Sequence, residues 1–253
     1  METDAYLQRI KYGGDVQPTE ATLRALHRAH LFTVPFENLD ISLGREIICD
    51  EARILRKIVD EHRGGFCYEL NGAFAGLLRA LGFRVTLLSA RVTSEEGTRG
   101  PEFDHLVLRV DLEEPWLADV GFGECFIEPL RLDSRAEQSQ EGRVYRLARL
   151  PSEDGISVVE AMVEGKWKRQ YTFSLRPREL SEFAGMCHYH QTSPQSHFTR
   201  QQICSLATPE GRITLSGKRL IEQQAGVRRE RFLAGDEEWR AILRELFGVV
   251  LPS

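Results

Sequence analysis

Apolar residues that follow a Gly-Gly pair recur at the spacing of one buried helix face. They are Leu70, Ala73, Phe74, Leu77, Leu78 and Leu81, which fit the i, i+3, i+4 pattern of an α-helix. Cys67 falls in the first turn of this predicted helix, where unpaired N–H groups and the helix dipole favour an anion such as a thiolate. Gly64 and Gly65 permit a tight turn before it. The alternative is that Cys67 is a small buried hydrophobic residue, as most lone cysteines are.

Residues 1–82 are predicted to be mostly helical. Thr19 is a candidate N-cap for a helix over Glu20–Ala29, and Asp50 is one for a helix over Glu51–His62. Between them, residues 33–39 contain Pro35, which excludes a regular helix there. We expect this segment to be an ordered loop.

After Gly82 the apolar residues alternate with polar ones, which predicts β-strands. The predicted strands are Phe83–Val92, His105–Asp111, Trp116–Val120, Val144–Leu150, Ile156–Val163 and Trp167–Leu175. Residues 93–103 are polar and contain glycine and proline, so we expect a loop. From Arg178 onward the pattern is mixed, with a strand at Arg212–Leu215 and a final helix over Glu237–Phe247. Helices followed by antiparallel strands and a mixed segment predict an α+β fold.

Composition excludes several classes of protein. The 253 residues are 42% hydrophobic and 28% charged, as in ordinary soluble domains. The net charge of −5 argues against a nucleic-acid binder, no apolar run is long enough to span a membrane, and the first residues lack the features of a secretory signal. The five cysteines include no C-x-x-C pair, which favours free thiols in a reducing cytoplasm over disulfides or a metal site.

A catalytic thiol needs a neighbouring base, and the chain has seven histidines. His27 and His30 share one predicted helix and favour core or surface roles. His188 and His190 lie near Cys187, but the paired ligands of a zinc site are not evident.

His105 is the preferred base because it begins a strand whose hairpin partner carries Asp119. The two side chains share a face in only half of the strand registers. The alternative for Asp119 is to cap the turn at Gly121–Gly123.

Several separate motifs resemble those of the arylamine N-acetyltransferases, over nearly the whole chain. The segment RGGFCYELNGAF at 63–74 is similar to the family's active-cysteine motif, and VPFENL at 34–39 is similar to its N-terminal loop motif. Asp104-His105-Leu106 and the DVGFG segment at 119–123 resemble the segments that carry the family's histidine and aspartate. QTSP at 191–194 and CSL at 204–206 also resemble family segments.

The resemblance implies a catalytic triad of Cys67, His105 and Asp119 and an acetyl-cysteine intermediate. Acetyl-CoA is the implied donor, and arylamines, arylhydrazines or N-hydroxyarylamines are the implied acceptors, reacting by a ping-pong mechanism without a metal. The implied architecture is α+β in three parts. They are a helical domain at 1–84 carrying the nucleophile, a β-barrel-like domain at 85–185 carrying the histidine and aspartate, and an α/β lid at 186–253.

Further roles follow from the same resemblance. Arg63 and Glu37 are expected to form an ion pair beneath the triad, with an ordinary helix-end salt bridge as the alternative. The expected acceptor contacts are Phe36, Phe122, Phe126 and Asp104, although core packing is an alternative for the phenylalanines. The expected CoA contacts are Pro101, Glu102, Phe103, Tyr189, Gln195 and Ser196. The sequence contains no G-x-G-x-x-G or P-loop motif.

Three other functions are compatible with the residues. The first is an amide synthase of the same fold with a different acyl donor, the second a thiol hydrolase, and the third a non-catalytic binder of aromatic compounds. We expect a cytoplasmic monomer or homodimer that binds neither nucleic acid nor membranes. Cys125, next to Glu124 after the DVGFG segment, suggests the further hypothesis of oxidative pairing with Cys67.

Overall fold

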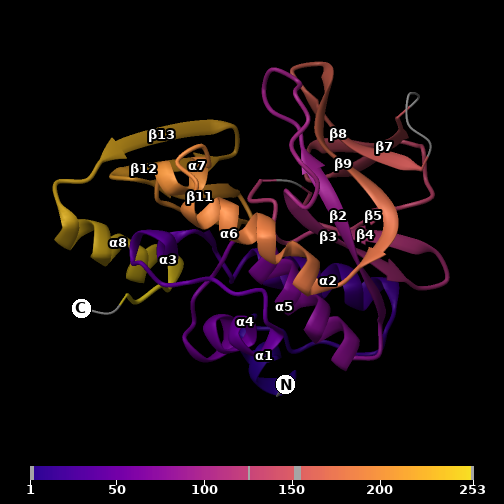
Figure 1. Cartoon of the computed structure of the whole chain (residues 1–253), viewed down its shortest axis with the longest axis horizontal. Helices are drawn as coiled ribbons and strands as arrows, with labels where there is room; N and C mark the ends of the chain where they lie inside the picture. Colours follow the sequence, from indigo (N-terminus) through magenta and orange to yellow (C-terminus); the bar gives the residue numbers. More distant parts are fainter. Residues whose placement is uncertain (1–2, 125, 151–154, 252–253) are drawn as a thin grey trace.

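A computed structural model describes residues 3–124, 126–150 and 155–251. Figure 1 shows N-terminal helices below two separate β-sheets. The fold is α+β, with N-terminal helices, a near-closed antiparallel β-barrel and a C-terminal sheet with helices, which confirms the predicted fold class. Within the described ranges, no helix is long and apolar enough to cross a membrane.

The N-terminal helices are α1 (Thr3–Arg9), α2 (Glu20–Leu31), α3 (Leu39–Ser42), α4 (Glu51–Leu55) and α5 (Cys67–Ala80). The predicted caps are confirmed, because the Thr19 side chain accepts from the Thr22 amide and the Asp50 side chain from the Arg53 amide. The helix predicted over 51–62 is α-helical only to Leu55 and continues as a π-helical turn, η1 (Arg56–Asp60). Helix α5 is buried on nearly every side, and it forms the centre of the largest hydrophobic core.

The larger sheet has eight antiparallel strands in the order β5-β4-β3-β2-β9-β8-β7-β6. Their bounds are β2 (Arg84–Val92), β3 (His105–Asp111), β4 (Pro115–Ala118), β5 (Leu130–Arg131), β6 (Gln138–Gln140), β7 (Arg143–Arg149), β8 (Ile156–Val163) and β9 (Lys166–Arg178). Residues along β3 alternate between two faces, as expected for a strand. Leu106, Leu108 and Val110 pack in the core around α5, whereas Val107 packs in a second core inside the sheet.

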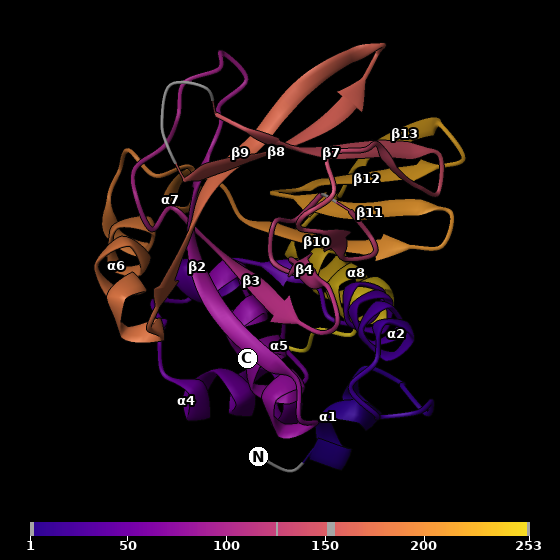
Figure 2. The ribbon, with the colours of Figure 1, turned by 90° about the vertical axis from the view of Figure 1, so that its right-hand side faces the viewer.

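The C-terminal sheet has the strand order β1-β10-β11-β12-β13. Its strands are β10 (Ile203–Thr208), β11 (Gly211–Ser216), β12 (Arg219–Gln224) and β13 (Val227–Phe232), and helix α8 (Asp236–Phe247) contacts β10. Strand β1 (Phe36–Glu37) comes from the segment that we expected to be a loop, and it pairs with β10. Before this sheet come η2 (Leu180–Phe183), α6 (Ala184–Thr192) and α7 (His197–Arg200). Figure 2 shows the two sheets from a second side.

Candidate active site

Cys67 is the first residue of helix α5, and close backbone packing determines its position. The Gly65 carbonyl accepts from the Glu37 amide at 2.9 Å. A Cβ on Gly64 would lie 1.9 Å from the Pro35 carbonyl oxygen, so only glycine fits there. Neither Gly64 nor Gly65 has a positive φ. Gly64 is therefore required for close approach to Pro35, whereas a Cβ on Gly65 would lie 2.6 Å from the Glu69 side chain.

The strand register brings His105 and Asp119 together. Leu108 pairs with Ala118 in the β3–β4 ladder, so Asp119, just past the end of β4, lies diagonal to His105 on the same face. His105 Nε2 lies 2.8 Å from Asp119 Oδ2. This leaves Nδ1 to face Cys67, whose side chain is hydrogen-bonded to His105. The Cys67, His105 and Asp119 side chains are thus connected in one chain of hydrogen bonds.

Asn71 joins the helix to the strands and was not among the predicted site residues. Its Nδ2 donates to the Leu106 carbonyl at 2.7 Å and to Asp119 Oδ1 at 2.9 Å, while its Oδ1 accepts from the Val120 amide at 2.9 Å. The signal available in the sequence was its position four residues after Cys67, which places both on one helix face. Asp119 Oδ1 also accepts from the Gly121 amide at 3.0 Å, so the turn-capping role and the contact with His105 are both present.

His27 supports the backbone of Asp119 from the other side. His27 Nε2 accepts from the Asp119 amide at 3.1 Å, so its Nδ1 carries the proton and donates to the Ile127 carbonyl at 2.7 Å. Burial is the main cause that lowers the pKa of His27, to about 4, although these hydrogen bonds act against it. His27 is therefore neutral at pH 7, and of the two roles expected for it, core or surface, it has the core role.

The charges in this group favour a protonated His105. Burial alone would lower the pKa of His105, but the Asp119 carboxylate and the hydrogen bonds to Asp119 and Cys67 raise it to about 10. Burial would raise the pKa of Asp119, yet His105, Asn71 and the Gly121 amide keep it below its usual value. Burial raises the pKa of the Cys67 thiol, while its hydrogen bond to His105 and the His105 charge act to lower it.

A buried cluster of charged side chains lies beneath the start of α5. Arg63 contacts Glu37 at 2.8 Å and Asp40 at 2.9 Å, so the predicted Arg63–Glu37 ion pair is present. Lys57 contacts Asp40 at 2.8 Å and Glu69 at 2.7 Å. With three carboxylates against two cations, burial raises the pKa of Glu69 to about 7, although Lys57 acts to lower it.

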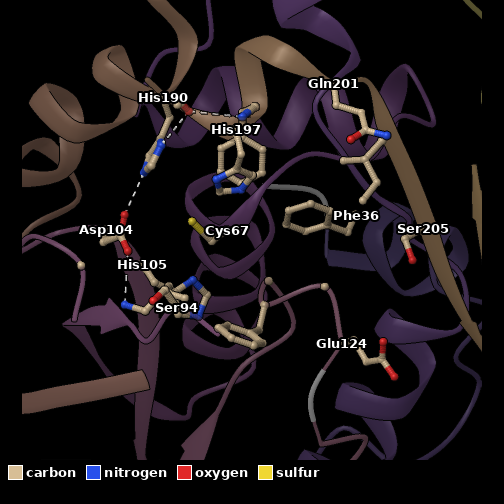
Figure 3. A pocket seen from close by; sticks show the side chains of 18 of the residues that line it. Phe36, Cys67, Ser94, Asp104, His105, Glu124, His190, His197, Gln201 and Ser205 are labelled. Carbon is tan, nitrogen blue, oxygen red and sulfur yellow. Dashed lines mark hydrogen bonds and ion pairs between the residues drawn. The ribbon is translucent and has the colours of Figure 1, made fainter. Parts of the chain in front are cut away.

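A cavity of about 810 Å³ opens above Cys67, between the two sheets. Figure 3 shows Cys67 with His105 on one side and with His190 and His197 on the other. The predicted site residues that line this cavity are Phe36, Cys67, Pro101, Asp104, His105, Phe122, Tyr189, Gln195 and Ser196. Asp119 is behind His105 and does not line it.

Three residues expected to contact substrates lie elsewhere. Phe126 is 1% exposed and packs on His27 and Tyr145 in the core. Core packing was the alternative given for this residue. Phe103 packs against Phe183, and Glu102 forms an ion pair with Arg178. Neither Phe103 nor Glu102 lines the cavity.

A second histidine–carboxylate pair, which was not predicted, lines the cavity. His190 Nε2 lies 3.2 Å from Asp104 Oδ1, and His190 Nδ1 lies 3.2 Å from Ser196 Oγ. These residues come from α6, the end of the β2–β3 loop and the N-cap of α7. Their separation along the chain gave no sequence signal.

Two other expectations concern Cys125 and a metal site. Cys125, proposed to pair with Cys67, lies outside the described residues. Among the residues that the structure describes, no group of three or more His, Cys, Asp or Glu side chains is arranged to hold a metal ion.

Comparisons with known proteins identify the family of the chain. A family model described as N-acetyltransferase matches residues 19–253. The chain is 34% identical to the arylamine N-acetyltransferase pineal gland isozyme NAT-3 of Gallus gallus, covering 100% of this chain and 96% of that protein. It is 30% identical to proansamycin X synthase of Amycolatopsis mediterranei, covering 96% and 95%.

The structure of the Mycobacterium marinum arylamine N-acetyltransferase in complex with CoA is also similar. It superposes with a TM-score of 0.89 at 31% identity, covering 98% of this chain and 93% of that one. The family model and these full-length similarities show that the chain belongs to the arylamine N-acetyltransferase family of acyltransferases.

Proposed function

We propose that Cys67, His105 and Asp119 form a catalytic triad that transfers the acetyl group of acetyl-CoA to an arylamine nitrogen. The observation that supports this most directly is the hydrogen-bonded chain from Asp119 through His105 to Cys67, with 2.8 Å between His105 and Asp119. All three residues are at most 4% exposed, and Cys67 and His105 face the cavity.

The first half-reaction loads the enzyme. His105 holds the proton of Cys67, giving a thiolate and an imidazolium whose charge Asp119 stabilises. The thiolate attacks the thioester carbonyl of acetyl-CoA, a new C–S bond forms to Cys67, and the bond to the CoA sulfur breaks. The departing CoA thiolate takes the proton from His105. One thioester replaces another, so this step is nearly balanced in free energy.

The second half-reaction releases the product. The amine nitrogen attacks the acetyl-thioester, the C–S bond breaks, and the amine proton moves to His105. This restores the thiolate–imidazolium pair. The amide is more stable than the thioester, so the sequence runs forward. Arylhydrazines react in the same way, and the hydroxyl of an N-hydroxyarylamine is the nucleophile for O-acetylation.

The cavity offers surfaces suited to both substrates. Phe36 and Phe122 supply aromatic walls for a flat amine, and Phe122 packs against His105 with ring centroids 5.2 Å apart. Pro101, Tyr189, Gln195 and Ser196 line the same cavity and are the proposed CoA contacts. The bound CoA in the similar mycobacterial enzyme supports acetyl-CoA as the donor. We further propose a monomer or homodimer in a reducing cytoplasm, where the thiol stays free.

The test is the intact mass of the protein after mixing with acetyl-CoA in the absence of amine. We expect one added acetyl group on Cys67 that is lost when 4-aminobenzoate is added. Cys67→Ala should gain none, while Cys204→Ser, which changes a buried thiol outside the cavity, should be acetylated normally. No adduct on wild type, with Cys67 still alkylated rapidly, would point to another acyl donor. No adduct with a slow thiol would leave a structural role for Cys67 and a protein that is a non-catalytic binder.

A second candidate is an amide synthase, supported by the near full-length similarity to proansamycin X synthase. Such an enzyme would load a longer acyl chain on Cys67 and join it to an amine. Competition between acetyl-CoA and longer thioesters in the same mass assay separates the two functions. Acetylation of Cys67 with turnover of small arylamines favours the acetyltransferase.

A further inference from the structure

Hydrogen bonds join the loop before α4 to helix α6, and the residues that form them do not line the cavity. The Ile47 amide donates to Gln191 Oε1 at 2.6 Å, and Gln191 Nε2 donates back to the Ile47 carbonyl at 2.8 Å. Cys187, one helical turn before Gln191, also points at this carbonyl, with 3.7 Å between sulfur and oxygen. The backbone of residues 47–49 and this face of α6 are therefore in direct contact.

Two free thiols meet beside this junction. Cys187 is 1% exposed, whereas Cys49 is half-buried. The two side chains are hydrogen-bonded to each other, and this bond together with burial raises the pKa of Cys187. Both thiols pack in the core around α5. No step of the proposed acetyl transfer uses either of them.

We propose that Cys49 and Cys187 are a redox-modification site that closes to a disulfide when the protein meets a peroxide. The half-buried Cys49 thiolate attacks hydrogen peroxide, giving a sulfenic acid and releasing hydroxide. The Cys187 sulfur then attacks the sulfenic sulfur, an S–S bond forms, and water leaves. The two thiols lose two electrons in total to the peroxide. This proposal is independent of the proposed acetyl transfer, because Cys67 takes no part.

The disulfide would join segments that are far apart in the sequence. It closes a loop of more than half of the 253 residues, and a cross-link over a long loop restricts the unfolded chain strongly. It also fixes α6, which carries Tyr189 and His190 to the cavity. We therefore expect the oxidised protein to unfold at a higher temperature than the reduced protein.

Peptide mapping tests the proposal. The full chain is treated with hydrogen peroxide, its remaining thiols are alkylated, and it is digested with trypsin. We expect peptide 46–53 joined to peptide 179–200, lighter than their sum by two hydrogen atoms, and a melting temperature raised by several degrees that returns to the starting value with dithiothreitol. Cys49→Ser should lose both effects. Cys204→Ser, which removes a buried thiol in another core, should keep both.

Several outcomes are distinguishable in the same map. Recovery of Cys49 and Cys187 as alkylated thiols after peroxide treatment, or in links to other cysteines, would overturn the proposal. A link between the peptides that contain Cys67 and Cys125 would instead support the pairing suggested from the sequence. Cys67→Ala should still form the Cys49–Cys187 link, so failure of the proposed catalysis does not affect this result.

Discussion

Replacing Asp119 by asparagine tests the proposed triad most directly. The substitution keeps the size of the side chain but removes the negative charge 2.8 Å from His105 Nε2. An asparagine nitrogen turned toward His105 would also place a donor against Nε2, the nitrogen that donates to Asp119 in the wild type. Because burial alone lowers the pKa of His105, we expect the imidazole to become neutral at pH 7 and to stop stabilising a thiolate on Cys67.

The magnitude follows from the pKa of His105. The rise from 6.5 to about 10 corresponds to about 5 kcal/mol in favour of the imidazolium. Relaxation of the site and the remaining hydrogen bonds recover part of this free energy. We therefore expect the alkylation rate of Cys67 at pH 7 to fall by about 10³-fold. Acetylation of Cys67 by acetyl-CoA should fall by a similar factor.

The assay is the rate of Cys67 carbamidomethylation by iodoacetamide, followed by intact mass between pH 5 and pH 9. Glu124→Gln is the matched control, because Glu124 also lines the cavity but forms its ion pair with Arg143 at 2.8 Å. This control should react at nearly the wild-type rate. A natively folded Asp119→Asn protein with an unchanged rate at pH 7 would refute the reasoning about the charge of His105.

Three further predictions concern the supports of the site. Arg63→Met should lower the free energy of unfolding in urea by about 3–5 kcal/mol, because it leaves two buried carboxylates without their guanidinium; a loss below 1 kcal/mol would contradict this. Gly121→Ala places a Cβ 2.8 Å from the Cα of Cys67 and should slow acetylation of the thiol at least about tenfold, whereas Gly185→Ala, in open space, should not. His27 has a folded-state pKa of about 4 against 6.5 unfolded, so the unfolded chain binds more protons between these values, and stability falls as pH drops from 6.5 to 4. Wild type should lose about 3 kcal/mol more than His27→Asn over this range, and equal losses in urea titrations would refute it.

Local patterns in the sequence predicted the elements that carry the site. The apolar stripe placed α5 and the alternation placed β2 and β3 within a residue or two of their observed bounds, because burial on one face leaves a clear period. Strand β13 was not predicted, because its six residues are all exposed and no buried face imposes alternation.

What the sequence did not determine depends on tertiary contact. The β3–β4 register that places Asp119 beside His105 is fixed by packing on α5 and by the Asn71 amide, and neither is a local property. The buried charges Asp40, Lys57 and Glu69 look like ordinary surface residues in the sequence. Phe126 was assigned to the cavity by resemblance, but its ring turns into the core against His27.

The division of the site between α5 and the β3–β4 hairpin has a consequence for biosynthesis. Cys67 is made before His105 and Asp119, and the two parts are joined only when the Asn71 side chain reaches the Leu106 carbonyl and Asp119. In a nascent or partly assembled chain, Cys67 would react as an ordinary cysteine. Acquisition of an acetyl group from a thioester would then report that helix and hairpin have docked, and such labelling would count correctly folded molecules in a mixed population.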